Sequence, residues 1–321
     1  MIKKLFIAFL ISFLISVNVY AKKITIIVFH AGSLSVPFSK MEKVFKKKYP
    51  YIEVRRESSG SVQAVRKVID LHKPCDVIAV ADYTLVPKML FPKYAKYVKL
   101  FARNELVLCF TNRSKYAKII NSKNWYKILA KQDVKWGFSN PNDDPCGYRT
   151  VLAIGLAGIY YKNLNIVKSL ILKNTNITWK VEKNKVIFEV PRSLSFNPER
   201  LAIRPKSVAL LGLLESGAID YAFEYKSVAL QHHLKFIELP KAINLSSLKW
   251  KRFYKRAEII LGNHKRIHAK PIVYGITVLK SAPHPKEAKL WEDFVTSKIG
   301  ADILRECHQT PIYPAKVIYS K

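Results

Sequence analysis

The stretch KITIIVFHAGSLS, residues 23–35, sets the pattern for this chain. Residues 24–29 form a continuous apolar run that predicts a buried strand, and the small residues after it predict a turn. Phe38, Met41 and Phe45 then recur at the spacing of one helix face. Strand, turn and helix in this order make the first half of a βαβ unit.

The same unit recurs along the chain. Residues 51–61 and 75–83 each predict a strand that ends in a polar turn before a helix. The alternation starts again later, with predicted strands at 134–139, 201–205, 220–225 and 235–239. Such alternation is typical of a mostly parallel sheet with right-handed crossovers. The sequence therefore predicts an α/β protein of two lobes, each a mostly parallel sheet flanked by helices.

Two strands are expected to connect the lobes, one within residues 105–112 and one within 271–280. We expect the first lobe to comprise residues 22–108 and 275–321, and the second lobe residues 109–274. The polar, alternating residues 174–200 predict a surface ribbon on the second lobe. Ligands of two-lobed proteins bind in the cleft between the lobes, so the site is expected there.

Composition excludes a disordered chain, because 49% of the 321 residues are hydrophobic. The formal net charge of +32 is compatible with a nucleic-acid partner, but the basic residues are spread through the chain without a recognisable binding motif. We therefore expect no nucleic-acid partner. The four cysteines form no CxxC pair, which argues against structural zinc, while one or two disulfides remain an open alternative.

The first residues predict export. Lys3 and Lys4 precede an apolar run at 5–17, and Ala21 fits the small-residue rule for signal cleavage. We expect residues 1–21 to be a signal peptide, with an uncleaved membrane anchor as the alternative. Either form places the protein outside the cytoplasm, at the outer face of the cell membrane.

Polar turns fall at strand ends or helix starts throughout the sequence. They contain Ser33, Ser61, the segment NDDPCG at 142–147, Ser207 and Tyr225. Because free backbone N–H groups and hydroxyls converge at such positions, these turns together predict an anion receptor. The competing interpretation is that each polar residue only caps a helix, and this applies above all to the acids of NDDPCG.

Catalytic motifs give no better interpretation. The sequence has no G-x-S-x-G, H-E-x-x-H or P-loop lysine pattern. His30 and Ser33 raise the alternative of a secreted hydrolase, but neighbours on one turn seldom face each other with a third orienting group. We therefore expect no enzyme and no cofactor.

The chain resembles the archaeal tungstate/molybdate-binding proteins of ABC importers, which have the type II periplasmic-binding-protein fold. The resemblance covers nearly the whole chain after residue 21 and is carried by HAGSLSVPF, ESSGSVQAVRK, CDVIAVADYTLVPKM, NPNDDPCGYR, IRPKS and YKSVALQHHLKFIELP. It implies a monomeric solute-binding protein that captures tungstate or molybdate and delivers the ion to a membrane permease. It also implies that oxyanion-binding groups lie at the matching positions, which are Gly32, Ser33, Ser61, Asp144, Pro145, Cys146, Ser207 and Tyr225.

Asp144 is implied to bond directly to the tungsten or molybdenum. A carboxylate beside a dianion is repelled unless it ligates the metal, and hexavalent tungsten accepts oxygen ligands in a way that sulfur of sulfate does not. The family has a glutamate after RPK, whereas this chain has Ser207. Coordination then either stops short of six or is completed by Glu224, although strand alternation predicts that Glu224 and Tyr225 point to opposite faces. Ser207 also favours the alternative ligands sulfate and phosphate.

Overall fold

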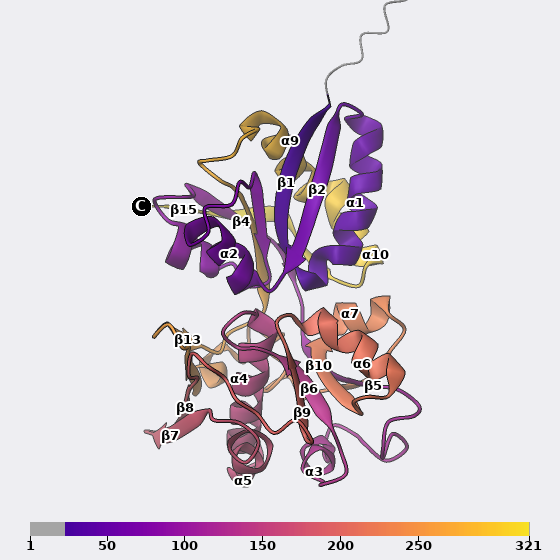
Figure 1. Cartoon of the computed structure of the whole chain (residues 1–321), viewed down its shortest axis with the longest axis vertical. Coiled ribbons are helices and arrows are strands. Elements are labelled where there is room, and N and C mark those ends of the chain that lie inside the picture. The colour runs from indigo at the N-terminus through magenta and orange to yellow at the C-terminus, as the bar shows by residue number, and fades with distance from the viewer. Residues whose placement is uncertain (1–22, 321) are drawn as a thin grey trace, which may run out of the picture.

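The computed structural model describes residues 23–320, which form two lobes stacked along the long axis of the molecule (Figure 1). The predicted signal segment, residues 1–21, lies outside the described residues. Among the helices of residues 23–320, none is long and apolar enough to cross a membrane.

A six-stranded sheet forms the core of the upper lobe in Figure 1. Three of its strands are parallel neighbours, and β14 and β15 run antiparallel to the strands beside them. The order is β15-β4-β14-β3-β1-β2. The strands are β1 (Ile24–Ala31), β2 (Ile52–Ser59), β3 (Val77–Val80), β4 (Tyr97–Arg103), β14 (Val273–Val278) and β15 (Thr310–Tyr319).

Helices cover this sheet as the apolar spacing predicted. Phe38 and Phe45 of α1 are fully buried, and both rings pack edge-on against Trp291 of α9, at 5.6 and 5.1 Å between centroids. The helices of this lobe are η1 (Gly32–Leu34), α1 (Ser35–Lys48), α2 (Ser61–Ile69), η2 (Val86–Leu90), α9 (Pro285–Val295) and α10 (Lys298–Glu306). Because the β1 and β2 turns lead directly into η1 and α2, both turns open toward the other lobe (Figure 1).

The lower lobe contains a five-stranded sheet in the order β11-β5-β10-β6-β9. Only β5 runs antiparallel to its neighbours, so this sheet is also mostly parallel. Its strands are β5 (Leu106–Phe110), β6 (Trp136–Ser139), β9 (Leu201–Arg204), β10 (Tyr221–Tyr225) and β11 (Lys235–Glu238). Its helices are α3 (Trp125–Leu129), α4 (Pro145–Tyr160), α5 (Asn165–Val167), η3 (Lys168–Leu172), η4 (Ser207–Leu210), α6 (Leu211–Ser216) and α7 (Lys226–Gln231).

A smaller four-stranded sheet contains the ribbon expected at 174–200. The hairpin β7 (Thr178–Glu182) and β8 (Lys185–Glu189) pairs through β8 with β12 (Ala257–Ile260), beside β13 (Arg266–His268). The short α8 (Lys251–Tyr254) precedes β12. This sheet packs on α4, where a methyl group on Gly155 would approach the Phe188 ring to 2.7 Å. Consequently α4 is buried over almost its whole length.

Two helices begin within the predicted polar turns. Helix α4 begins at Pro145, inside the segment NDDPCG, because proline suits the first position of a helix. Ser207 is the first residue of η4, which leads directly into α6. The expected lobe borders at 108 and 275 fall inside β5 and β14, which belong to different sheets. The division into 22–108 with 275–321, and 109–274, stays a proposal.

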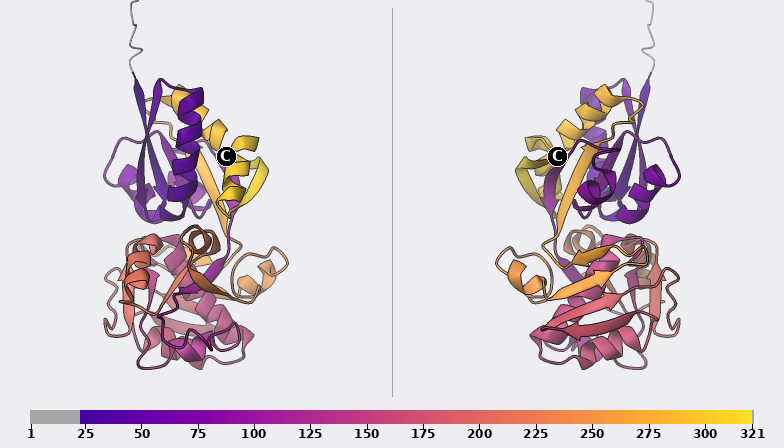
Figure 2. Two further views of the ribbon diagram at one scale, coloured as in Figure 1. Left: turned by 90° about the vertical axis from the view of Figure 1, so that its right-hand side faces the viewer. Right: turned by 90° about the vertical axis from the view of Figure 1, so that its left-hand side faces the viewer.

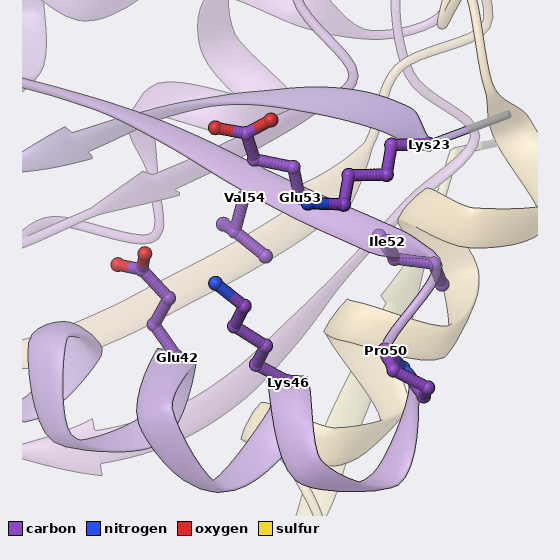
Figure 3. Close-up of a pocket in the computed structure, with 7 residues that line it drawn as sticks. All are labelled: Lys23, Glu42, Lys46, Pro50, Ile52, Glu53 and Val54. Atoms are coloured by element: carbon purple, nitrogen blue, oxygen red, sulfur yellow. The ribbon is translucent and has the colours of Figure 1, made fainter. Parts of the chain in front are cut away.

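A hollow at the outer end of the upper lobe lies between α1 and the first residues of β1 and β2 (Figure 3). The hollow is lined by charges of both signs, from Lys23, Glu42, Lys46 and Glu53. The polar turns of β1 and β2 lie at the opposite ends of these strands. This hollow is therefore separate from the predicted anion site.

Candidate functional site

The predicted polar turns meet where the two lobes touch. The 3₁₀ helix η1 packs against η4, so a methyl group on Gly32 would lie 2.9 Å from the Val208 side chain. At the start of α2, the N–H groups of Val62 and Gln63 donate to the Asp143 carbonyl oxygen at 3.1 and 3.2 Å. The turns of the two lobes therefore contact each other at the level where the lobes face each other in Figure 2.

The two serines of the upper lobe are held by fixed donors. The Ser61 hydroxyl oxygen accepts the Ala81 N–H at 2.9 Å, which leaves the Ser61 hydroxyl proton for another acceptor. The Ser33 hydroxyl lies 2.8 Å from the Tyr274 hydroxyl, which in turn accepts the Asn104 amide at 3.1 Å. Either hydroxyl can donate in the Ser33–Tyr274 bond, and when Tyr274 donates, the Ser33 proton is available to another acceptor. Both serines are less than 5% exposed.

Tyr225 is held in the same way from the lower lobe. Its hydroxyl oxygen accepts from the Arg149 guanidinium at 2.6 Å, so its proton points away from that cation. Arg149 also donates to the Ala81 carbonyl at 2.9 Å across the cleft, and it is fully buried. A buried positive charge thus contacts the Tyr225 hydroxyl and the carbonyl of Ala81, the residue whose N–H bonds to Ser61, which is a favourable setting for an anion.

A second set of contacts joins the lobes beside Arg149. The Asp82 carboxylate follows β3 and accepts from the Tyr148 hydroxyl at 2.8 Å, with Lys270 at 3.1 Å and Arg149 at 3.9 Å. Burial by itself would raise the pKa of Asp82, but Lys270 and Arg149 lower this pKa below its usual range. Asp82 is therefore ionised and bridges residues of both sheets.

Asp144 is the residue directly before α4, and its carboxylate reaches across to η4. Its side chain makes no capping hydrogen bond in α4 by distance and angle, and its Oδ2 accepts the Ser207 N–H at 3.0 Å. Burial raises the pKa of Asp144 to about 6, although hydrogen bonds from Ser139, Ser207 and the Cys146 backbone lower it in part. The following Pro145 occupies the first turn of the helix, and Cys146 is fully buried. Asp144 thus stands at the N-cap position of α4, and capping of α4 alone does not account for its bond to η4.

Glu224 lies at the end of β10 and is completely buried. Its Oε2 accepts the Tyr225 N–H at 2.8 Å, and its Oε1 has no hydrogen-bond partner among the described residues. The pKa of Glu224 is raised to about 8, mainly by burial, and the Asp144 charge contributes to the rise. Phe223 and Tyr225 pack in the large core, whereas Ala222 packs in a second cluster with Val107 and Cys109, so the side chains of β10 alternate between two faces as expected.

His30 and Ser33 do not form a catalytic pair. The His30 ring nitrogen Nδ1 donates to the Ala31 carbonyl at 2.9 Å, while Ser33 bonds to Tyr274. Burial lowers the pKa of His30 to about 4, so the ring is neutral at physiological pH. The four cysteines are all free and buried, which answers the open question of disulfides in the negative.

Several residues of this arrangement were not predicted from the sequence. Arg149 stands within the motif NPNDDPCGYR, but only its burial against Ala81 and Tyr225 reveals its role. Asn104 and Tyr274 fall on the two segments that connect the lobes. The available signal in the sequence was their place at the two predicted connections between the lobes, because the two connecting strands run next to each other and their residues come into contact.

Comparison with known proteins identifies the kind of site. Residues 26–307 match the family described as bacterial extracellular solute-binding protein. The chain belongs to this family. Among its relatives, the molybdate/tungstate-binding protein WtpA of Pyrococcus abyssi is 49% identical over 91% of this chain and 86% of its own length. The WtpA of Thermococcus kodakarensis is 46% identical over 92% of this chain and 85% of its own length.

Solved structures confirm the fold of this solute-binding protein. The periplasmic molybdate-binding protein of Azotobacter vinelandii superimposes with a TM-score of 0.60 at 15% identity, over 89% of this chain and 98% of its own. The two-lobed periplasmic-binding-protein architecture and the resemblance to archaeal tungstate/molybdate-binding proteins are thus confirmed. The chain is accordingly a solute-binding protein and not an enzyme.

Proposed function

We propose that this protein captures tungstate or molybdate outside the cytoplasm and delivers the oxyanion to the permease of an ABC importer. The ion enters as cargo, and no cofactor takes part. Support comes from the names of the WtpA relatives and from the solute-binding family. The residues proposed to hold the ion are Gly32, Ser33, Ser61, Asp144, Pro145, Cys146, Ser207 and Tyr225.

The observation that carries the proposal is a set of three buried hydroxyl groups, each of which already takes part in a hydrogen bond with a neighbouring group of the protein. Ser61 accepts from a backbone N–H, Tyr225 accepts from Arg149, and Ser33 is linked to Tyr274. Ser61 and Tyr225 therefore each have a proton to donate to an anion, Ser33 has one when Tyr274 donates to it, and these groups come from both lobes. Only a closed cleft brings them together, so the binding free energy of the ion favours closure.

Asp144 sets the class of oxyanion in this proposal. It is a buried carboxylate among donors that favour a dianion, and it would repel sulfate or phosphate. Tungsten and molybdenum accept its oxygen as a ligand, which turns repulsion into a bond. The neutral Ser207 beside it favours sulfate or phosphate as the alternative ligand, since a hydroxyl there donates to any tetrahedral oxyanion.

The proposed cellular setting follows from the same family. We propose that the protein acts as a monomer at the outer face of the membrane, with residues 1–21 as signal peptide or anchor. Its protein partner in this scheme is the importer's permease, and no nucleic acid takes part. Analytical ultracentrifugation and membrane fractionation of the expressed full chain distinguish these features from a secreted oligomer.

Isothermal titration of the wild-type protein with tungstate, molybdate and sulfate tests the proposal. We expect both metal oxyanions to bind at least about 100-fold more tightly than sulfate, because only they form a bond to Asp144. Asp144→Asn is expected to weaken tungstate binding at least about tenfold, while sulfate binding stays unchanged or improves.

Asp143→Asn is the matched control, because the Asp143 carboxylate bonds only to the neighbouring Asn140 amide, at 2.8 Å. It should bind tungstate like the wild type. Sulfate binding as tight as tungstate binding would favour the alternative, and no heat with any oxyanion would end the proposal.

A further inference from the structure

A chain of hydrogen bonds runs from the Ser33 hydroxyl to the lower lobe through the two segments that connect the lobes. The Ser33 hydroxyl lies 2.8 Å from the hydroxyl of Tyr274 on β14, and that hydroxyl accepts the Asn104 amide at 3.1 Å. Asn104 stands between β4 and β5, and its amide also donates to the Ser227 hydroxyl of α7 at 2.8 Å. All four side chains are buried. Ser33 is thus linked to both connecting segments.

The orientation of the Asn104 amide is set by its own neighbours. Its side-chain oxygen accepts the Glu105 N–H at 3.0 Å and the Ser227 N–H at 3.4 Å, so its nitrogen faces the two hydroxyl groups. Both protons of the amide nitrogen are used, one on Ser227 and one on Tyr274. One lone pair of the Tyr274 oxygen is therefore occupied by a donor that is fixed from three sides.

The direction of the bond between Tyr274 and Ser33 follows from what each proton can reach. Among residues 23–320, the Tyr274 hydroxyl has no acceptor other than Ser33 within hydrogen-bond distance, so its proton is unpaired unless it points at Ser33. An unpaired buried donor costs free energy. A phenol, which ionises near about pH 10, is also a stronger donor and a weaker acceptor than an aliphatic hydroxyl. Both considerations favour Tyr274 as the donor.

The main chain of Ser33 is held separately from its hydroxyl. The Ser33 carbonyl oxygen accepts the side-chain amide of Gln309 at 3.1 Å, and Gln309 is buried just before β15. The backbone of η1 therefore does not depend on the bond to Tyr274. A change at Tyr274 acts on the rotation of the Ser33 hydroxyl and leaves the turn in place.

We propose that Tyr274 and Asn104 are positioning residues for the oxyanion, and that both act through Ser33. Asn104 holds Tyr274 in the orientation of a donor, Tyr274 donates to the Ser33 oxygen, and the Ser33 proton is left for the ion. Neither Tyr274 nor Asn104 contacts the ion in this scheme. The inference rests on the proposed function, because it assigns a role at that same site. Because Ser227 belongs to the lower lobe, the donor direction at Ser33 depends on contact between the lobes.

A double-mutant cycle tests the coupling, with tungstate affinities from titration calorimetry. Tyr274→Phe removes only the hydroxyl and keeps the ring, whose centroid lies 6.1 Å from those of Phe101 and Tyr225. We expect it to weaken tungstate binding about fivefold, as for loss of one hydrogen bond. Ser33→Ala should weaken binding at least about tenfold, because it removes a donor to a charged ligand. In the Ser33→Ala background, Tyr274→Phe should change the affinity by less than about twofold.

Asn104→Asp tests the direction of the chain. The carboxylate still accepts the two backbone N–H groups, but a second acceptor replaces the amide donor. The Tyr274 proton then turns to this carboxylate, Ser33 donates to Tyr274, and the ion loses a donor. The added charge repels the ion in both the wild-type and the Ser33→Ala background, so the loss that passes through Ser33 is the difference between them. We expect this difference to be at least about fivefold.

Tyr97→Phe is the matched control. It removes a hydroxyl from the same sheet, but this hydroxyl donates to Glu292 of α9 at 2.8 Å. Tungstate affinity should stay unchanged in this variant. Wild-type affinity in Tyr274→Phe, or a full loss from Tyr274→Phe in the Ser33→Ala background, would overturn the inference. Equal losses from Asn104→Asp in the two backgrounds would overturn the role of Asn104.

Neutron diffraction from crystals of the wild-type protein with tungstate locates the hydroxyl deuterons without any variant. We expect the Tyr274 deuteron on the line to Ser33 and the Ser33 deuteron directed at the ion. A Ser33 deuteron on the line to Tyr274 would refute the inference and leave the oxyanion function intact. A wild-type protein that binds no tungstate in the calorimeter refutes both.

Discussion

Closure of the lobes can be blocked without changing any group proposed to touch the ion. Gly60 precedes α2 with φ −61° and ψ 142°, a conformation that alanine adopts without strain. In the closed cleft a methyl group there would lie 2.3 Å from the Asp143 carbonyl oxygen and 2.9 Å from the Pro205 carbonyl oxygen. Both are backbone atoms, which cannot move aside like a flexible side chain. Gly60→Ala is therefore compatible with an open cleft and incompatible with a closed one.

The expected cost follows from the contacts that the methyl group separates. The N–H groups of Val62 and Gln63 both donate to the Asp143 carbonyl, and both bonds are lost when α2 moves away. At about 1 kcal/mol for each bond, the closed state loses about 2 kcal/mol. Because about 1.4 kcal/mol corresponds to a tenfold change, tungstate affinity should fall about 30-fold in Gly60→Ala.

Titration calorimetry gives this affinity, and small-angle X-ray scattering gives the contraction on adding tungstate. We expect Gly60→Ala to contract less than wild type, with an unchanged unfolding temperature in the absence of ligand. The control is Gly212→Ala on α6, where an added methyl group has no atom within 4 Å. A Gly60→Ala protein that binds and contracts like wild type would refute the closed geometry described above.

Two further predictions concern buried charges. Asp82→Asn leaves Lys270 and Arg149 without their shared carboxylate, so the closed state should be destabilised by about 3 kcal/mol. Titration calorimetry should show weaker tungstate binding. An unaltered tungstate affinity would contradict the bridge between the lobes. Burial lowers the pKa of His30 from 6.5 in the unfolded chain to about 4 in the folded protein. Folding therefore keeps this ring neutral, and the free energy of unfolding is unaffected by it above pH 6.5 but falls by about 3 kcal/mol as the pH drops to 4. Urea unfolding at pH 7 and pH 4.5 measures this loss, which should shrink in His30→Asn; an equal loss in both proteins would show that other groups cause it.

Much of the fold could be predicted from the sequence because its signals are local. The apolar run before Ala31 and the helical spacing of Phe38, Met41 and Phe45 correspond to β1 and α1. The strands β4 and β15 were not predicted. Residues 310–319 are mostly exposed, so they lack the apolar alternation that indicates a buried strand. They pair because β4 offers a free edge.

The candidate site divides in the same way. Three of the site residues were predicted because each lies at the carboxyl end of a strand, and the ends of parallel strands meet at one edge of a sheet. These residues are Ser33, Ser61 and Tyr225. Whether Asp144 caps its own helix or faces η4 could not be predicted, since both arrangements have the same local sequence. In the structure the Asp144 carboxylate accepts the N–H of Ser207, which is 63 residues away along the chain.

The sequence by itself determined the order of strands and helices, the polar turns and the membership of the family, because these depend on residue type and short-range spacing. Only the tertiary structure decided which buried charges have partners. Arg149 meets Tyr225 and Asp82, whereas Asp144 meets the Ser207 N–H and forms no ion pair within residues 23–320. Those contacts join segments that are far apart in the chain, and they exist only because the packing of α4, η4 and β10 brings the segments within a hydrogen bond's length.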